Sequence, residues 1–211
     1  MIKISSEIPF LWRLSPESSS GCCSVALVVP SASDTDVRDL TIETGILSLS
    51  SEDSGSETEE VLEWNQEDLA LFLALINRSQ FLEEQGHSET LKVDLTDPEV
   101  IEIIHIVAAA GFGTAYTSKG LLRETSKLTH LNNCEIGATA TLNTVSGFVS
   151  CVVVDLEDDD VVCVLLNNIS ERHQGLIEEV HRHDLLLVNR VDLLNPEFAA
   201  DYKRPLDGVL H

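Results

Sequence analysis

Basic side chains are scarce in this sequence. The 211 residues include 13 Lys and Arg against 36 Asp and Glu, which gives a formal net charge of -23. Such a chain repels the phosphates of nucleic acids and anionic membrane surfaces, and it attracts basic proteins or cations. We therefore expect no direct binding to nucleic acid or to membranes. Three origins of the charge stay open: salt adaptation of the whole surface, recognition of a basic partner, and a cation site.

Aromatic residues and long apolar runs are also few. Two Trp, two Tyr and six Phe without a basic stripe do not fit stacking on nucleic-acid bases. The longest apolar stretch, Ala70 to Ile76, is far shorter than the ~20 residues that span a bilayer. Near the N-terminus, the apolar run from Ile8 to Trp12 is too short for a signal peptide. We expect a cytoplasmic, globular protein.

Signatures of catalysis and of metal binding are missing. The motifs Ser-x-x-Lys, Gly-x-Ser-x-Gly and His-Glu-x-x-His do not occur. His173, His181 and His183 do not share one helix face, and no fixed-spacing zinc set completes them. The five cysteines show no CxxC pairing and are expected to be reduced. We expect no catalytic residues, no cofactor and no metal.

Strands are predicted in the first third of the chain. Residues 21–29 are apolar and β-branched, and residues 40–49 alternate around Gly45, which suggests a bulge or a turn. The Ser-rich acidic segment SLSSEDSGSETEE follows, with no apolar residue after Leu49. We expect an exposed loop over 50–60.

Helices are predicted in the middle. Asn65 can cap a helix from about Gln66 to Glu84, and Thr96-Asp-Pro-Glu99 is a capping box for a helix that Gly111 closes. Ser118 is expected to cap a third helix over about 119–128.

The last third predicts strands again. Residues 135–143 suggest one strand, and 148–156 with 161–167 form a hairpin around the acidic turn 157–160. A helix from Ser170 to about His183 and a strand over 185–191 complete the pattern. The order predicts a single α+β domain over residues 1–211, with a mainly antiparallel sheet, a central helical segment and a C-terminal hairpin-helix-strand.

Two acidic clusters are the candidate partner-binding residues. They are Asp155, Glu157, Asp158, Asp159 and Asp160 at the hairpin, and Glu57, Glu59 and Glu60 in the loop. Calcium loops interleave carboxylates with a Gly that permits a sharp turn, and the hairpin run has none. The hairpin is therefore typical of a solvated tip or of a partner-binding prong.

These observations favour a non-enzymatic acidic protein that engages a basic partner, as an inhibitor, an immunity protein or a nucleic-acid mimic. Val161 to His183, a strand leading by a capped turn into a helix, resembles the end of a roadblock or longin domain. That resemblance implies, as an alternative, a scaffold or adaptor subunit. Thr144 to Asn168 is similar to the last hairpin of serine β-lactamase-like proteins, whose catalytic Ser-x-x-Lys is missing here. An enzyme on a small cationic substrate is the third alternative, and the oligomeric state stays open.

Overall fold

The chain divides into two compact units, Met1–Gly113 (unit 1) and Thr114–His211 (unit 2). The computed structural model describes residues 2–4, 10–17, 21–30, 39–49, 58–78, 91–125, 128–173 and 176–198. The positions of the units relative to one another are not determined, so each is described by itself. That the whole chain forms a single domain stays a prediction.

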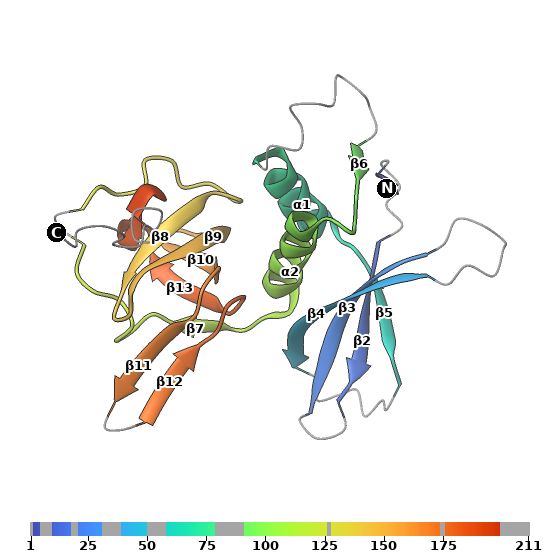
Figure 1. Cartoon of the computed structure of the whole chain (residues 1–211), viewed down its shortest axis with the longest axis horizontal. Helices are drawn as coiled ribbons and strands as arrows, with labels where there is room; N and C mark the ends of the chain where they lie inside the picture. The colour runs from blue at the N-terminus through green and yellow to red at the C-terminus, as the bar shows by residue number, and fades with distance from the viewer. Residues whose placement is uncertain are drawn as a thin grey trace, which may run out of the picture. The chain divides into compact units, whose positions relative to one another are not determined.

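Unit 1 is built on a four-stranded antiparallel sheet (Figure 1). The strand order is β4–β3–β2–β5, with β2 at Leu11–Pro16, β3 at Cys22–Val29, β4 at Leu40–Leu49 and β5 at Glu60–Glu63. A separate pair joins β1 (Ile2–Ile4) to β6 (Leu91–Val93). The register shifts opposite Gly45, which takes a φ of +70°, so the expected bulge is confirmed.

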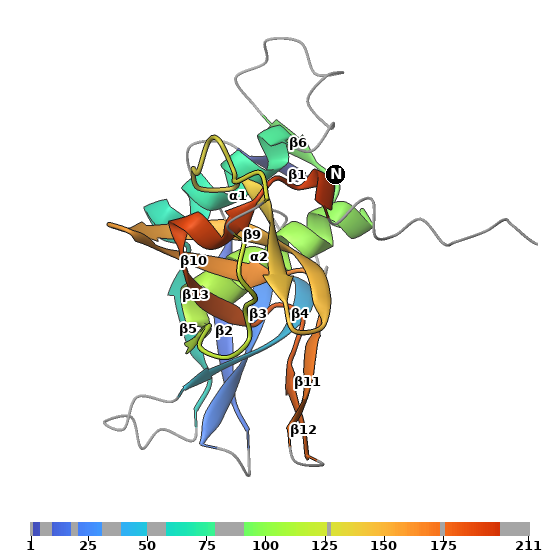
Figure 2. The ribbon, with the colours of Figure 1, turned by 90° about the vertical axis from the view of Figure 1, so that its left-hand side faces the viewer.

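Two helices, α1 (Gln66–Arg78) and α2 (Pro98–Phe112), cover one face of this sheet (Figure 2). Asn65 caps α1 as expected, because its Oδ1 accepts from the backbone N–H groups of residues 67 and 68 at 2.8 Å. The cap of α2 is Asp97 rather than Thr96, and the helix ends at Gly113, two residues later than Gly111. Pro98 stands at the first helical position, where its missing N–H costs nothing.

An aromatic cluster joins the sheet of unit 1 to its helices. The Trp12 and Trp64 rings stack with centroids 5.1 Å apart, and three Phe rings meet them edge-on. These are Phe10, Phe72 and Phe112. Edge-to-face geometry adds to the apolar burial of such rings. Five of the ten aromatic residues therefore hold this one layer together.

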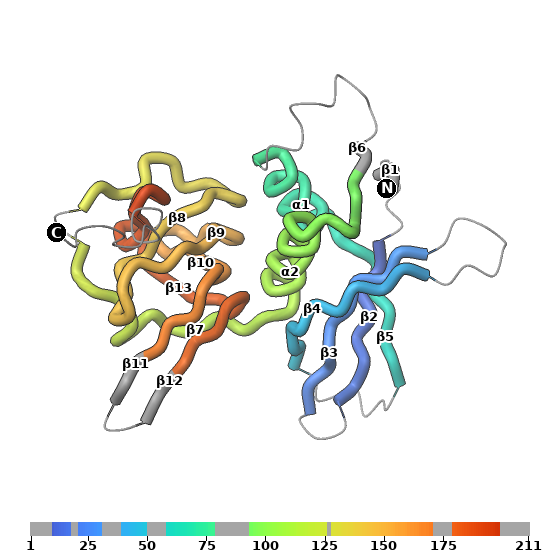
Figure 3. Tube along the Cα trace, viewed as in Figure 1, coloured from blue at the N-terminus to red at the C-terminus, as the bar shows by residue number. Residues whose placement is uncertain are grey.

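Unit 2 contains a six-stranded sheet in the order β14–β8–β9–β10–β13–β7, which curls around its own core (Figure 3). The strands are β7 (Ala115–Thr117), β8 (Thr139–Thr144), β9 (Gly147–Glu157), β10 (Asp160–Leu165), β13 (Leu185–Asn189) and β14 (Leu193–Leu194). A 3-10 turn, η2 (Arg190–Asp192), links the last two. All neighbours are antiparallel except β13 and β7. The α+β class, the mainly antiparallel sheet and the hairpin around 157–160 are confirmed.

The helix expected from Ser170 to His183 is wrong. The segment forms the antiparallel pair β11 (Ile169–His173) and β12 (Leu176–Val180). The backbone N–H and C=O of Ser170 bond to the hydroxyl of Ser146 in the turn between β8 and β9, so Ser170 does not cap a helix. The sequence also carries Gly175, which costs a helix interior about 1 kcal/mol relative to Ala.

The third helix, expected over 119–128, is also wrong within the described residues. Gly120 takes a φ of +85°, which a right-handed helix does not accommodate. The backbone beyond it pairs with the region of β8: the Arg123 N–H donates to the Asn143 carbonyl, and the Val145 N–H donates to the Leu121 carbonyl. These bonds to a distant strand replace those of a helix.

Candidate functional site

The acidic hairpin of unit 2 turns in two residues. Glu157 and Asp160 pair across the strands, and Asp158 and Asp159 form the turn between them. Asp158 takes a φ of +50°, a left-handed conformation that Asp and Asn tolerate better than most residues. All five predicted residues, from Asp155 to Asp160 without Leu156, are exposed. The structure therefore brings this predicted cluster together on one exposed tip.

A β-bulge sets the direction of Asp155. Val153 pairs with Cys163 and Asp155 pairs with Val162, so Val154 is the extra residue on β9. Val153 lies in the core, and in a strand without a bulge Asp155, two positions later, would point into the core as well. The bulge instead turns Leu156 toward the core and leaves Asp155 exposed. Asp155, Glu157 and Asp160 consequently share the outer face of the hairpin.

Arg190 of η2 holds the tip through main-chain groups. Its backbone N–H donates to the Asp159 carbonyl at 2.9 Å, and its Nη2 donates to the Asp158 carbonyl at 3.2 Å. Of the residues that the structure describes, none forms an ion pair with the five carboxylates. Arg190 thus fixes the backbone of the turn through carbonyl groups and does not pair with the carboxylates.

The cluster is electrostatically unfavourable in the isolated chain. Glu157 lies directly opposite Asp160, and like charges in such cross-strand positions are destabilising. The Asn189 amide offsets this repulsion only weakly, because its contact with Asp160 Oδ1 is 3.5 Å long. Val191 follows Arg190 and is 62% exposed, so an apolar side chain lies beside the acidic turn. Sequence reasoning missed Arg190 and Val191, because their place beside the tip depends on the pairing of β10 with β13.

The second predicted cluster is only partly described. Glu57 lies outside the described residues, while Glu59 and Glu60 are exposed. Glu59 Oε1 accepts from the Ser15 hydroxyl at 3.0 Å, and Glu60 begins strand β5. The end of the expected loop at 50–60 therefore belongs to a sheet.

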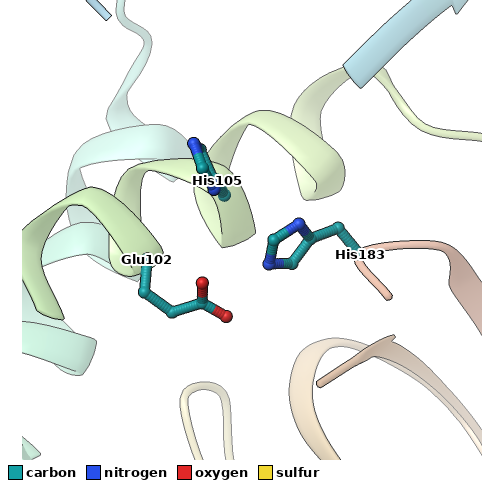
Figure 4. A group of neighbouring side chains, drawn as sticks. All are labelled: Glu102, His105 and His183. Carbon is teal, nitrogen blue, oxygen red and sulfur yellow. The ribbon is translucent and has the colours of Figure 1, made fainter. Parts of the chain in front are cut away.

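None of the three histidines lies on a helix, because His173 ends strand β11 and His181 and His183 lie in the turn region before β13. The His181 N–H donates to Asp184 Oδ2 at 2.7 Å, and the His181 ring is 3.8 Å from the carboxylates of Glu179 and Asp184. In unit 1, Glu102 and His105 lie one turn apart on α2 (Figure 4), whereas His183, also drawn there, belongs to unit 2. Taken unit by unit, the described side chains bring no three potential metal ligands together.

All five cysteines are free thiols. Cys151 and Cys163 are buried in the core of unit 2, where the hydrogen bond between their side chains and desolvation raise the pKa of the Cys163 thiol well above its usual range. Burial also raises the pKa of Cys134. Nucleophilic cysteines need a lowered pKa, so the shifts at Cys163 and Cys134 run against that role.

No protein-family model matches the chain, and no curated protein matches its sequence. Within the described parts of the chain, no helix is long and apolar enough to cross a membrane.

Proposed function

We propose that this chain is a non-enzymatic binding protein that engages a basic partner protein through the tip of the β9–β10 hairpin. The observation that carries the proposal is the arrangement of the five exposed carboxylates around a turn that Arg190 holds by its main chain. An acidic surface whose geometry is fixed before binding loses little conformational entropy when a partner arrives.

The chemistry of the tip favours arginine or lysine as the binding group. Charge-assisted hydrogen bonds to carboxylates are about twice as strong as neutral ones, and arginine can bond a carboxylate through two N–H groups at once. A cation between Glu157 and Asp160 would also remove their mutual repulsion. Val191 adds an apolar contact beside the charged ones. The preferred partner surface is therefore cationic with an apolar residue at its edge.

A partner of this kind is a cationic enzyme or toxin, or a protein that otherwise binds nucleic acid. The chain would then act as an inhibitor, an immunity protein or a nucleic-acid mimic. The proposal includes a cytoplasmic location, because five free cysteines fit a reducing compartment. The scaffold alternative of roadblock or longin type relied on a terminal helix, and β11 and β12 occupy that segment.

The test compares two triple variants by their association rate with an arginine-rich peptide. The first changes Glu157, Asp159 and Asp160 to Lys; Asp158 stays, because Lys is less tolerant of its φ of +50°. The control changes three exposed acids that do not belong to the β9–β10 hairpin and alters the net charge equally. These are Glu17, Glu124 and Glu197.

We expect the hairpin variant to lower the association rate constant by about tenfold or more, and the control by about twofold or less. Circular dichroism must show that both variants stay folded. Equal loss in the two variants would mean that only the total charge of the chain attracts the peptide, and the proposal would be wrong.

A further inference from the structure

Among the described strands, β5 ends the four-stranded sheet of unit 1 and pairs with β2 alone. The Trp64 N–H donates to the Phe10 carbonyl at 3.2 Å, so Trp64 and Phe10 form a hydrogen-bonded pair of this antiparallel ladder. Hydrogen bonds alternate along such a pair, so Leu62 and Glu60 also direct their backbone groups toward β2. Val61 and Glu63 direct theirs away from the sheet.

All four residues of β5 are exposed, with Val61 at 56% and Leu62 at 36%. Among the described residues, none donates to or accepts from the outward backbone groups of Val61 and Glu63. Such an edge is a template for a further strand, and proteins usually blunt it with charge, proline or cover. The side chains of β5, Glu-Val-Leu-Glu, determine which further strand can pair with this edge.

A second copy of this chain is a poor occupant. Only outward-directed residues can face each other across a new antiparallel pair, so two β5 strands could set Val61 of one opposite Glu63 of the other, which pairs an apolar side chain with a charge and gives no cross-strand gain. The net charge of -23 opposes any such dimer further. The edge therefore discriminates against itself and in favour of an oppositely charged segment.

We propose that β5 accepts an extended segment of a partner protein as a fifth strand, and that this segment has the pattern basic–apolar–apolar–basic. Its basic residues would lie opposite Glu60 and Glu63, and its apolar residues opposite Val61 and Leu62. Backbone bonds to the outward groups of Val61 and Glu63 give affinity, while the cross-strand pairs give selectivity. This site lies in unit 1 and does not depend on the hairpin proposal.

The neighbouring carboxylate of Glu59 extends the acidic edge by one residue. Its Oε1 already accepts from Ser15, which holds the side chain beside the sheet. Arg13, on the neighbouring strand β2, pairs with Glu43 of β4 at 3.1 Å. No described ion pair therefore neutralises Glu59, Glu60 or Glu63.

The probe is a peptide with the core Lys-Val-Ile-Lys between Gly-Ser flanks, and its control has the same composition in the order Val-Lys-Lys-Ile. Binding is followed by NMR titration of the full chain. We expect the ordered peptide to bind at least about fivefold more tightly than the control. The amides of Val61 and Glu63 should become protected from hydrogen exchange, whereas the Leu62 amide, which already faces β2, should change little.

Two variants make the test reciprocal. Changing both Glu60 and Glu63 to Lys should weaken binding of the ordered peptide by about tenfold or more, and should give binding to a peptide with the core Glu-Val-Ile-Glu. Val61→Pro removes an outward N–H that β2 does not use, so it should abolish the protection at the edge while the sheet stays folded. The hairpin triple variant should bind the ordered peptide like the unchanged chain.

Equal binding of the two peptides, or binding without protection of the Val61 and Glu63 amides, would overturn the proposal in favour of unspecific attraction. Absence of binding at about 5 mM peptide would also overturn the proposal, because an affinity that low is weaker than a few cross-strand pairs should give. A dimer that Glu60→Lys with Glu63→Lys disrupts in sedimentation would show that a second copy is the occupant.

Discussion

The buried carboxylate of Asp68 should be the most important polar side chain for the stability of unit 1. It is 7% exposed and accepts two hydrogen bonds of 3.1 Å, from the Trp12 indole and from the Asn65 N–H. With the Asn65 side chain bonded back to residue 68, it completes a reciprocal cap of α1. Asp68→Ala removes the acceptor and leaves both donors unsatisfied.

The magnitude follows from the burial of these two donors. An unsatisfied buried donor costs about 1–3 kcal/mol, and the Asn65 N–H is only partly buried. We therefore expect Asp68→Ala to lower the free energy of unfolding by about 2–4 kcal/mol. Asp68→Asn keeps one acceptor oxygen and should lose less.

Urea unfolding followed by tryptophan fluorescence measures this effect in unit 1 alone, because both Trp residues of the chain lie there. The matched control is Glu67→Ala, an exposed acid in the same turn, for which the helix dipole predicts a loss of about 0.3–1 kcal/mol. If Asp68→Ala costs no more than Glu67→Ala, the bonds to Trp12 and Asn65 do not stabilise the fold as argued.

Three further predictions concern single features. The Thr96 hydroxyl and N–H, which bond Asp94 at 2.7 and 3.0 Å, lower the pKa of Asp94, so Thr96→Ala should raise that pKa in an NMR titration. Because the folded-state pKa of Asp94 is lowered, its bonds with Thr96 stabilise the fold above the ordinary carboxyl pKa, and this stabilisation is lost as the pH falls through the lowered value. An unchanged titration of Asp94 in the Thr96→Ala variant would contradict this role of Thr96. Deleting Val154 removes the extra residue and leaves Asp155 opposite Val162 on the outer face, so in thermal unfolding it should destabilise unit 2 about as much as Val154→Ala; a far larger loss would refute the assignment of Val154 as the bulged residue. At pH 8, the buried thiols of Cys151 and Cys163 should resist a thiol reagent until the chain unfolds, and rapid labelling of either would contradict the packing of the core.

Local signals in the sequence predicted the elements that local bonds stabilise. Asn65 caps α1 with its own side chain, the Pro98 region starts α2, and the acidic turn separates two apolar strands. Each of these depends on residues within a few positions, which is why a single sequence was enough for them.

Elements that depend on distant partners were missed. Ser170 looks like a cap, yet its backbone bonds to Ser146, 24 residues away. The bulge at Val154 exists only in the pairing of β9 with β10, and Arg190 reaches Asp158 across 32 residues. The acidic residues of the candidate site were therefore predicted, while the groups that aim and hold them were not. Gly120 and Gly175, which lie inside the two segments expected to be helical, were the residues in the sequence that disfavoured those helices.

The dependence of the association rate on salt tests the central claim most directly. The rate constant for the arginine-rich peptide is measured between 0.1 M and 1 M salt, over which the Debye length falls from about 10 Å to about 3 Å. We predict a steep fall for the unchanged chain and for the control with Glu17, Glu124 and Glu197 reversed, and a much shallower one for the variant with Glu157, Asp159 and Asp160 reversed. The same steep slope in all three proteins would contradict recognition at the hairpin tip.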